Sequence, residues 1–160
     1  MKKTIFLTIF LTATLFSQEL KIKANLFNAD QKTGISVFEG NVNIVRGKDE
    51  LNASKVTIYT NEKQEPTKFI AQGNASFHIE TLGGALYEGK AQKVIYLPIE
   101  KEYHFFKEVH LKQINEKKEI IGEEVILKTI EGKAYAKGAQ KEPVIMIFNM
   151  SKDVNKSKND

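Results

Sequence analysis

The chain has 160 residues, enough for one domain with one core, and no cysteine, which excludes a disulfide scaffold and thiolate metal sites. It has 24 basic and 20 acidic residues, and its only arginine is Arg46. Two of the lysines lie in the N-terminal segment described next, and without them the balance is 24 − 2 = 22 basic against 20 acidic residues. Nucleic acid is therefore not expected as a partner, because phosphate binding needs a marked basic excess.

The first 17 residues have the layout of a secretory signal peptide. Lys2 and Lys3 form a positive start, an apolar run extends from Ile5 to Phe16, and the small Ser17 precedes polar residues. The run is shorter than the about 20 apolar residues of a membrane-spanning helix. We expect cleavage near Ser17 and export of one domain that spans residues 18–150. An uncleaved N-terminal anchor is the alternative.

The rest of the chain has the pattern of short β-strands. Apolar residues alternate with polar ones over short runs, Gly, Asn and Lys-Glu clusters separate the runs, and no stretch shows sustained helical periodicity. The final residues, 151–160, contain one apolar side chain and are expected to be disordered. Strands are predicted at 19–24, 25–30, 35–46, 50–60, 66–72, 74–81, 85–88, 91–97, 102–112, 119–129, 133–137 and 143–149.

A hairpin-sized unit recurs along these strands. The segment "FEGNVNI", from Phe38 to Ile44, resembles "AQGNASFHI", from Ala71 to Ile79, and more loosely "FFKEVHL", from Phe105 to Leu111. Stacking such units buries apolar faces that a single unit could not bury alone. The repetition therefore predicts one extended β-structure with a continuous apolar face.

A bend is expected in the middle of the repeated unit. The alternation of apolar residues slips by one position between Ala53 and Val56, which predicts a bulge or a corner. Gly40 and Gly73 occupy matching positions in two units and are expected to leave space inside the bend.

The stretch "VFEGNVNIVRGKDELNASKVTIYT", preceded by "LKIKANLFNADQKTG", resembles the OstA-like repeat of the LptA family of periplasmic lipopolysaccharide-transport proteins. The matching elements are Leu20 and Ile22, Ala29-Asp30, the strand from Phe38 to Val42, and the segment from Leu51 to Val56. Departures are Ser54, where the family often has aspartate, and Lys107-Glu108, where the third unit lacks Gly-Asn. The resemblance covers roughly residues 20–150.

The resemblance implies a fold, a function and partners. The implied fold is an all-β, twisted and slightly open antiparallel β-jelly roll that is V-shaped. The implied function is to carry lipopolysaccharide or lipooligosaccharide across the periplasm for outer-membrane assembly, with its acyl chains in an apolar groove. The implied partners are an LptC-like inner-membrane protein, an LptD-like outer-membrane protein, and further copies of the chain joined end to end by strand addition.

Side chains of one parity form the expected groove. Each methylene shielded from water contributes about 0.8 kcal/mol, so a lipid carrier needs a long apolar lining. The alternative is that these residues form the closed core of a structural β-repeat interaction module, and alternation alone does not separate the two. The expected lining residues are Leu20, Ile22, Phe38, Val42, Ile44, Val56, Ile58, Phe77, Ile79, Tyr96, Val109, Leu111, Val125 and Leu127.

Three basic residues are candidates to contact lipid phosphates at the mouth of the groove: Arg46, Lys48 and Lys55. Plain solvation of exposed basic side chains is the alternative. The first strand, "LKIKANL", and the last, "EPVIMIFNM", are the candidate edge strands. Because the last is apolar on both faces, we expect it to pair with another subunit or a membrane-complex partner. A central strand buried on both faces is the alternative.

Catalysis has little support in the sequence. The three histidines, His78, His104 and His110, do not form a ligand cluster, and no motif of a serine hydrolase, zinc protease or phosphate-binding loop occurs. We therefore expect no enzyme activity, no metal and no cofactor. Within the same transport pathway, a membrane-anchored protein of the LptC type is the alternative to a free carrier.

Overall fold

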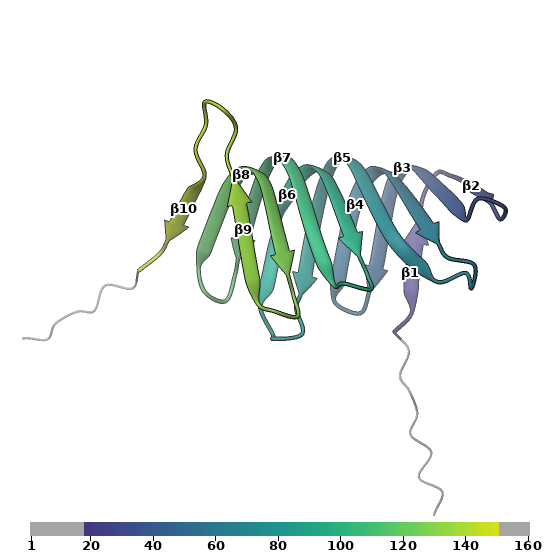
Figure 1. Cartoon of the computed structure of the whole chain (residues 1–160), viewed down its shortest axis with the longest axis horizontal. Helices are drawn as coiled ribbons and strands as arrows, with labels where there is room; N and C mark the ends of the chain where they lie inside the picture. Colours follow the sequence, from purple (N-terminus) through teal and green to yellow (C-terminus); the bar gives the residue numbers. More distant parts are fainter. Residues whose placement is uncertain (1–17, 151–160) are drawn as a thin grey trace, which may run out of the picture.

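The computed structural model describes residues 18–150, which form ten β-strands (Figure 1). The expected signal peptide, residues 1–17, and the expected disordered tail, residues 151–160, lie outside the described residues. Within the described range, no helix has the length and apolarity to cross a membrane. The strands are β1 (Leu20–Lys23), β2 (Leu26–Asp30), β3 (Ile35–Arg46), β4 (Asp49–Thr60), β5 (Pro66–Glu80), β6 (Leu86–Leu97), β7 (Glu102–Gln113), β8 (Lys118–Lys128), β9 (Lys133–Lys137) and β10 (Ile145–Phe148).

All ten strands belong to one antiparallel sheet with the order β1-β3-β4-β5-β6-β7-β8-β10. At one end, β1 and β2 pair with different halves of β3, and at the other end β10 and β9 pair with different halves of β8. The six long strands between them are bent in the middle, so the sheet folds into two facing arms. We call them the β1–β10 arm and the β2–β9 arm, after the short strands at their ends (Figure 1).

The bends lie at the same level in the five ladders between the six long strands, where the pairing register shifts. The extra residues belong to β3, β5 and β7, at Gly40–Asn41, Gly73–Asn74 and Lys107–Glu108. Both residues of each pair have left-handed backbone, with φ of 80° and 48°, 83° and 47°, and 63° and 52°. The corner predicted near Ala53–Val56 is therefore confirmed, and the bulged residues opposite it lie on the neighbouring strands.

The role expected for the glycines needs correction. Gly40 and Gly73 lie at positive φ, which favours glycine, and an added Cβ would lie 2.7 Å from the Asn25 Nδ2 and 2.6 Å from the Ser54 Oγ, respectively. Both neighbouring side chains are exposed. The glycines thus permit the left-handed bulge and leave space on its outer side, not inside the bend.

Two strands are longer than the alternation predicted. The segments expected at 66–72 and 74–81 are one strand, β5, and those expected at 85–88 and 91–97 are one strand, β6. In both cases the bend disturbs the pattern of side chains while the backbone ladder continues on either side of it.

The core lies between the two arms. Phe77 of the β1–β10 arm and Phe105 of the β2–β9 arm face each other with ring centroids 4.4 Å apart, although their strands are not neighbours in the sheet. Apart from the Tyr103 hydroxyl, the buried residues within 18–150 carry only apolar side chains. The interior therefore makes almost no hydrogen-bond demand on anything placed within it.

Candidate functional site

A first cavity opens between the arms near the N-terminal end of the sheet. Its volume is about 280 Å³, and residues from both arms line it, among them Leu20 of β1, Leu51 of β4 and Phe69 of β5. Leu20 is 40% exposed, whereas Leu51 and Phe69 are partly buried against the core. The cavity therefore joins the apolar interior to solvent.

Arg46 lies at the mouth of this cavity and connects the two arms. Its Nη2 donates to the Asp49 Oδ2 over 3.1 Å, and its guanidinium lies 5.5 Å from the ring centroid of Tyr96, which belongs to the opposite arm. Tyr96 stacks on Tyr103 at 4.4 Å. Burial, together with Tyr96 and the Asp49 carboxylate, raises the pKa of Tyr103 well above its ordinary value, so its hydroxyl stays neutral.

A second and larger cavity, of about 610 Å³, lies between the arms near the C-terminal end. Its apolar walls include Leu111 and Ile120 of the β1–β10 arm, Leu127 of the β2–β9 arm, and Met146 and Phe148 of the edge strand β10. Cavities of 300–1,000 Å³ are typical of ligand sites. The interior is thus open towards both ends of the folded sheet.

The predicted lining residues all lie in or against this interior, but they divide into two groups. Seven line a cavity, and the others form closed core or pack at its border. Those in the first cavity are Leu20, Ile44, Val56, Ile79 and Tyr96, and those in the second are Leu111 and Leu127. The fully packed ones are Val42, Ile58, Phe77, Val109 and Val125, with Ile22 and Phe38 partly buried against them.

The three predicted rim residues take different positions. Arg46 lines the first cavity and is paired, as described above. Lys48 is 79% exposed in its side chain and pairs with Glu80 over 3.3 Å. Lys55 is not at the mouth: it lies beside the bend on the outer face and pairs across the ladder with Glu39 over 2.9 Å. Lys55 lies in the middle of β4, within the strand predicted at 50–60.

The predicted lining set left out several interior residues, including Leu51, Val94, Tyr103, Phe105 and Ile120. Strands β4, β6 and β8 carry no extra residue at the bend, so their inward parity changes there, from Ala53 to Val56, from Ala91 to Val94 and from Gly122 to Val125. The one-residue slip in β4, between Ala53 and Val56, was recognised in the sequence. The same kind of slip in β6 and β8 could have identified their interior residues.

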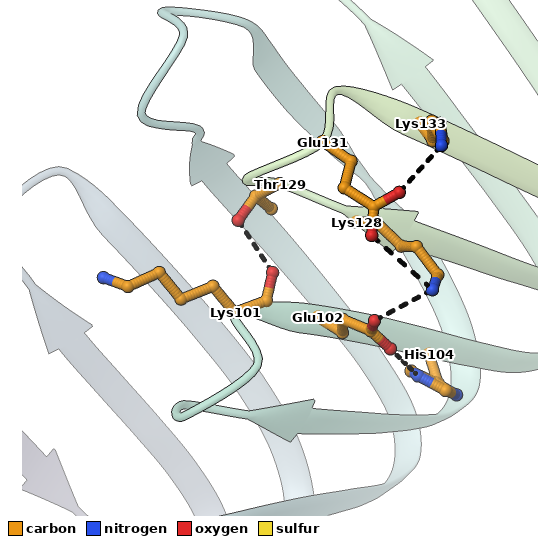
Figure 2. A network of polar contacts seen from close by, with 7 residues as sticks. All are labelled: Lys101, Glu102, His104, Lys128, Thr129, Glu131 and Lys133. Carbon is orange, nitrogen blue, oxygen red and sulfur yellow. Dashed lines mark hydrogen bonds and ion pairs between the residues drawn. The ribbon is translucent and has the colours of Figure 1, made fainter.

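On the outer face, a polar network braces the end of the β2–β9 arm (Figure 2). The Glu102 carboxylate contacts His104 Nε2 at 3.1 Å and Lys128 Nζ at 3.2 Å, and Glu131 links Lys128 to Lys133. The hydrogen bond with His104, and then the one with Lys128, lower the pKa of Glu102. Since these residues belong to β7, β8, β9 and the turn between β8 and β9, the network ties the edge strand β9 to its neighbours.

Two of the three histidines, His104 and His110, contact carboxylates. His104 contacts Glu102, and His110 Nε2 lies 2.7 Å from the Glu119 Oε2, which lowers the pKa of Glu119. Within residues 18–150, no three His, Asp or Glu side chains are grouped so that they could hold a metal ion.

Both ends of the sheet present edge strands. β1 and β2 pair only with β3, and β9 and β10 pair only with β8, among the described residues. In β10, Ile145, Met146, Ile147 and Phe148 are 48%, 49%, 39% and 55% exposed. The alternative of a central strand buried on both faces is therefore wrong, and the predicted edge assignment is confirmed.

Together, these features place the chain among all-β proteins built as an open antiparallel sheet folded around an apolar interior. Residues 21–133 match the family described as LptA/(LptD N-terminal domain) LPS transport protein. The chain belongs to this family, as its repeat units predicted.

A solved structure supports the same fold. The chain superposes with a TM-score of 0.73 on LptH, described as the LptA homologous periplasmic component of the conserved lipopolysaccharide transport device from Pseudomonas aeruginosa. The two are 16% identical over 83% of this chain and 96% of that one. The predicted V-shaped, open antiparallel fold is confirmed. A comparison with curated protein sequences finds no significant match.

Proposed function

We propose that this lipopolysaccharide-transport protein works in the periplasm as a carrier that holds lipid acyl chains between its two arms. The observation that carries the proposal is the buried core between the arms, which is apolar and opens in a cavity near each end, where polar residues such as Arg46 in the first cavity and Glu116 and Lys118 in the second join the lining. Because an acyl chain makes no hydrogen bonds, an interior without polar demands suits it better than a polar ligand.

The packed middle of the interior requires the arms to separate when a lipid passes. Phe77 and Phe105 close the centre, and Arg46 with Tyr96 closes the mouth of the first cavity. The bends are rows of bulges, where the ladder is interrupted in every pair of neighbouring strands. We propose that these bulges let the two arms move apart, so that the two cavities join into one groove.

The exposed edge strands support a bridging role. An unpaired strand offers a row of backbone donors and acceptors to another chain. In this proposal, the β1–β2 end and the β9–β10 end join copies of the chain end to end, or join the chain to an inner-membrane and an outer-membrane partner. The apolar interiors of successive copies then form one continuous path.

Adjacent residues on β4 give the test of lipid binding. Leu51 faces the first cavity, and its neighbour Asn52 is exposed on the opposite face. With a photo-crosslinking amino acid at position 51, we expect a crosslink to lipopolysaccharide after irradiation in cells or with purified lipopolysaccharide. The adduct is detected by blotting for the lipid.

The same probe at position 52 is the matched control, because it lies on the same strand next to position 51 but on the opposite, exposed face. Equal crosslinking from both positions would contradict the groove. No crosslink from position 51, in a protein with an unchanged circular dichroism spectrum, would instead support a closed structural module.

A further inference from the structure

An apolar row crosses the outer face of the β2–β9 arm, away from the lipid-facing interior. Cross-strand pairing places its members side by side from β3 to β9, with only Thr57 and His104 interrupting the aliphatic and aromatic side chains. All are half-buried by their neighbours except Tyr135, which is 56% exposed. The apolar members are Val37, Ile70, Ile95, Ile126 and Tyr135.

The corresponding row on the other arm is polar from β3 to β7 and ends in Ile121 of β8 and Ile145 of β10. There the outward residues from β3 to β7 are Asn43, Asn52, Ser76, Lys90 and His110, again joined by cross-strand pairing. Two outer faces built from the same strands therefore differ in chemistry. Solvation explains the polar residues, whereas a mainly apolar row on a sheet surface is typical of a contact site.

Charges on either side of the apolar row are arranged so that the face complements itself. β6 is the middle strand of the seven from β3 to β9. A twofold axis along β6, between two copies, places β4 opposite the β8 of the second copy and β3 opposite its β9. Lys55 then faces Glu124 of the second copy and Glu39 faces its Lys137, since all four belong to one cross-strand row.

The row nearer the mouth follows this rule only in part, because Lys128 and Lys133 face Tyr59 and Ile35 of the second copy. Lys68 of β5 faces Glu102 of the second copy's β7, while Ile95 and Leu97 of β6 meet their own copies at the axis. Lys93 is the one residue that meets a like charge, and its Nζ is directed over the Phe106 ring of its own chain, 5.8 Å from the centroid. Opposite charges therefore meet around an apolar centre.

We infer that this face binds the same face of a second copy, giving a twofold dimer that is separate from end-to-end joining and goes beyond the proposed lipid carriage. Six strand spacings of about 4.8 Å and five residues of about 3.3 Å give a face of roughly 400–500 Å² in each copy. The total of about 800–1,000 Å² lies below the standard size of specific interfaces. The dimer is therefore weak and forms as the protein concentration rises.

A single cysteine at the axis tests the geometry, because the natural chain has none. In the Ile95→Cys variant the two introduced thiols meet, so mild oxidation should give a covalent dimer. Ser76→Cys, exposed on the outer face of the other arm, is the matched control. Crosslinking of Ile95→Cys no faster than that of Ser76→Cys would overturn the proposal.

Charge reversal tests the pairing itself. Lys55→Glu places two carboxylates together, and Glu124→Lys places two ammonium groups together, so each should weaken dimerisation at least about tenfold in sedimentation equilibrium. The double variant Lys55→Glu/Glu124→Lys restores opposite charges across the twofold and should bind more tightly than either single variant, although position 55 then repels Glu39 and position 124 repels Lys137 of the same chain. A double variant as weak as the single ones would rule out the twofold dimer.

The sedimentation measurement is repeated in the Ile145→Asp background. Edge pairing through β10 is impaired there, so end-to-end joining contributes little to the measured association. Persistence of the dimer there supports face-to-face pairing, and its disappearance assigns the association to the edges instead. Lipid crosslinking at position 51 is independent of all these variants, so failure of the dimer leaves the proposed carrier function intact.

Discussion

Lys107 and Glu108 show how one backbone conformation is obtained from different residues. They adopt the left-handed bulge that Gly-Asn forms in the other two units, although neither is glycine. Left-handed backbone costs roughly 1–2 kcal/mol for an ordinary L-residue. Gln92 offsets part of this cost, because its Nε2 donates to the Glu108 Oε2 over 2.7 Å and to the Asn74 Oδ1 over 3.0 Å. One amide thereby links two successive bulges.

Restoring glycine at this bulge should stabilise the protein. Lys107→Gly removes the Cβ from a residue at φ 63°, and we expect a gain of about 1 kcal/mol in the free energy of unfolding, measured by chemical denaturation. Lys112→Gly, at an exposed position in the regular part of β7, is the control and should lose about 0.5–1 kcal/mol. Equal losses in both variants would show that backbone strain at residue 107 is negligible.

At the scale of elements, the short strands at the ends of the sheet differ most from the long ones. The six central strands each pair along both sides, whereas β10 pairs on one side only and exposes four apolar residues. Charged or proline residues usually protect such an edge. Within Ile145–Phe148 there are none, which is why pairing with another chain is expected there.

A charge on β10 should therefore weaken end-to-end association. In the Ile145→Asp variant, strand addition would bring a carboxylate into an apolar contact, so the concentration-dependent mass in sedimentation should shift towards the monomer. Ile130→Asp is the control, since Ile130 is 65% exposed in the turn between β8 and β9 and does not belong to an edge strand. An unchanged mass for Ile145→Asp would exclude β10 as the joining edge.

At the scale of the whole molecule, the two arms are held together by contacts of different strength. The Phe77–Phe105 contact is fully enclosed, whereas the contact between Arg46 and Tyr96 lies at the mouth, where Arg46 is 36% exposed. The mouth is therefore the part of the interior that opens with the least loss of buried surface.

Removing the Arg46 contact should loosen the mouth. In Arg46→Met we expect faster amide exchange at the ends of β3 and β6 and a loss of about 1 kcal/mol of stability, typical of one partly exposed charged contact. Lys48→Met is the control, because the Lys48–Glu80 pair lies within one arm and is largely exposed. Unaltered exchange at both strands would show that the arms are held by the packed centre alone.

The sequence alone determined the all-β fold, the family, the edge strands and most of the apolar interior. It could do so because alternation is a local property: Val56 and Ile58, or Phe77 and Ile79, share a face whatever lies beyond their strand. The corner at Ala53–Val56 was likewise visible as a local slip in this alternation.

The contacts between the two arms depend on the tertiary structure and could not be inferred from the sequence. Phe77 and Phe105 touch because the sheet folds back on itself, and Arg46 meets Tyr96 across the mouth for the same reason. Alternation cannot reveal either contact, since it assigns residues to a face without placing one face against another. The division of the interior into a packed centre and two cavities, and the apolar outer row of one arm, likewise depend on pairings between distant residues.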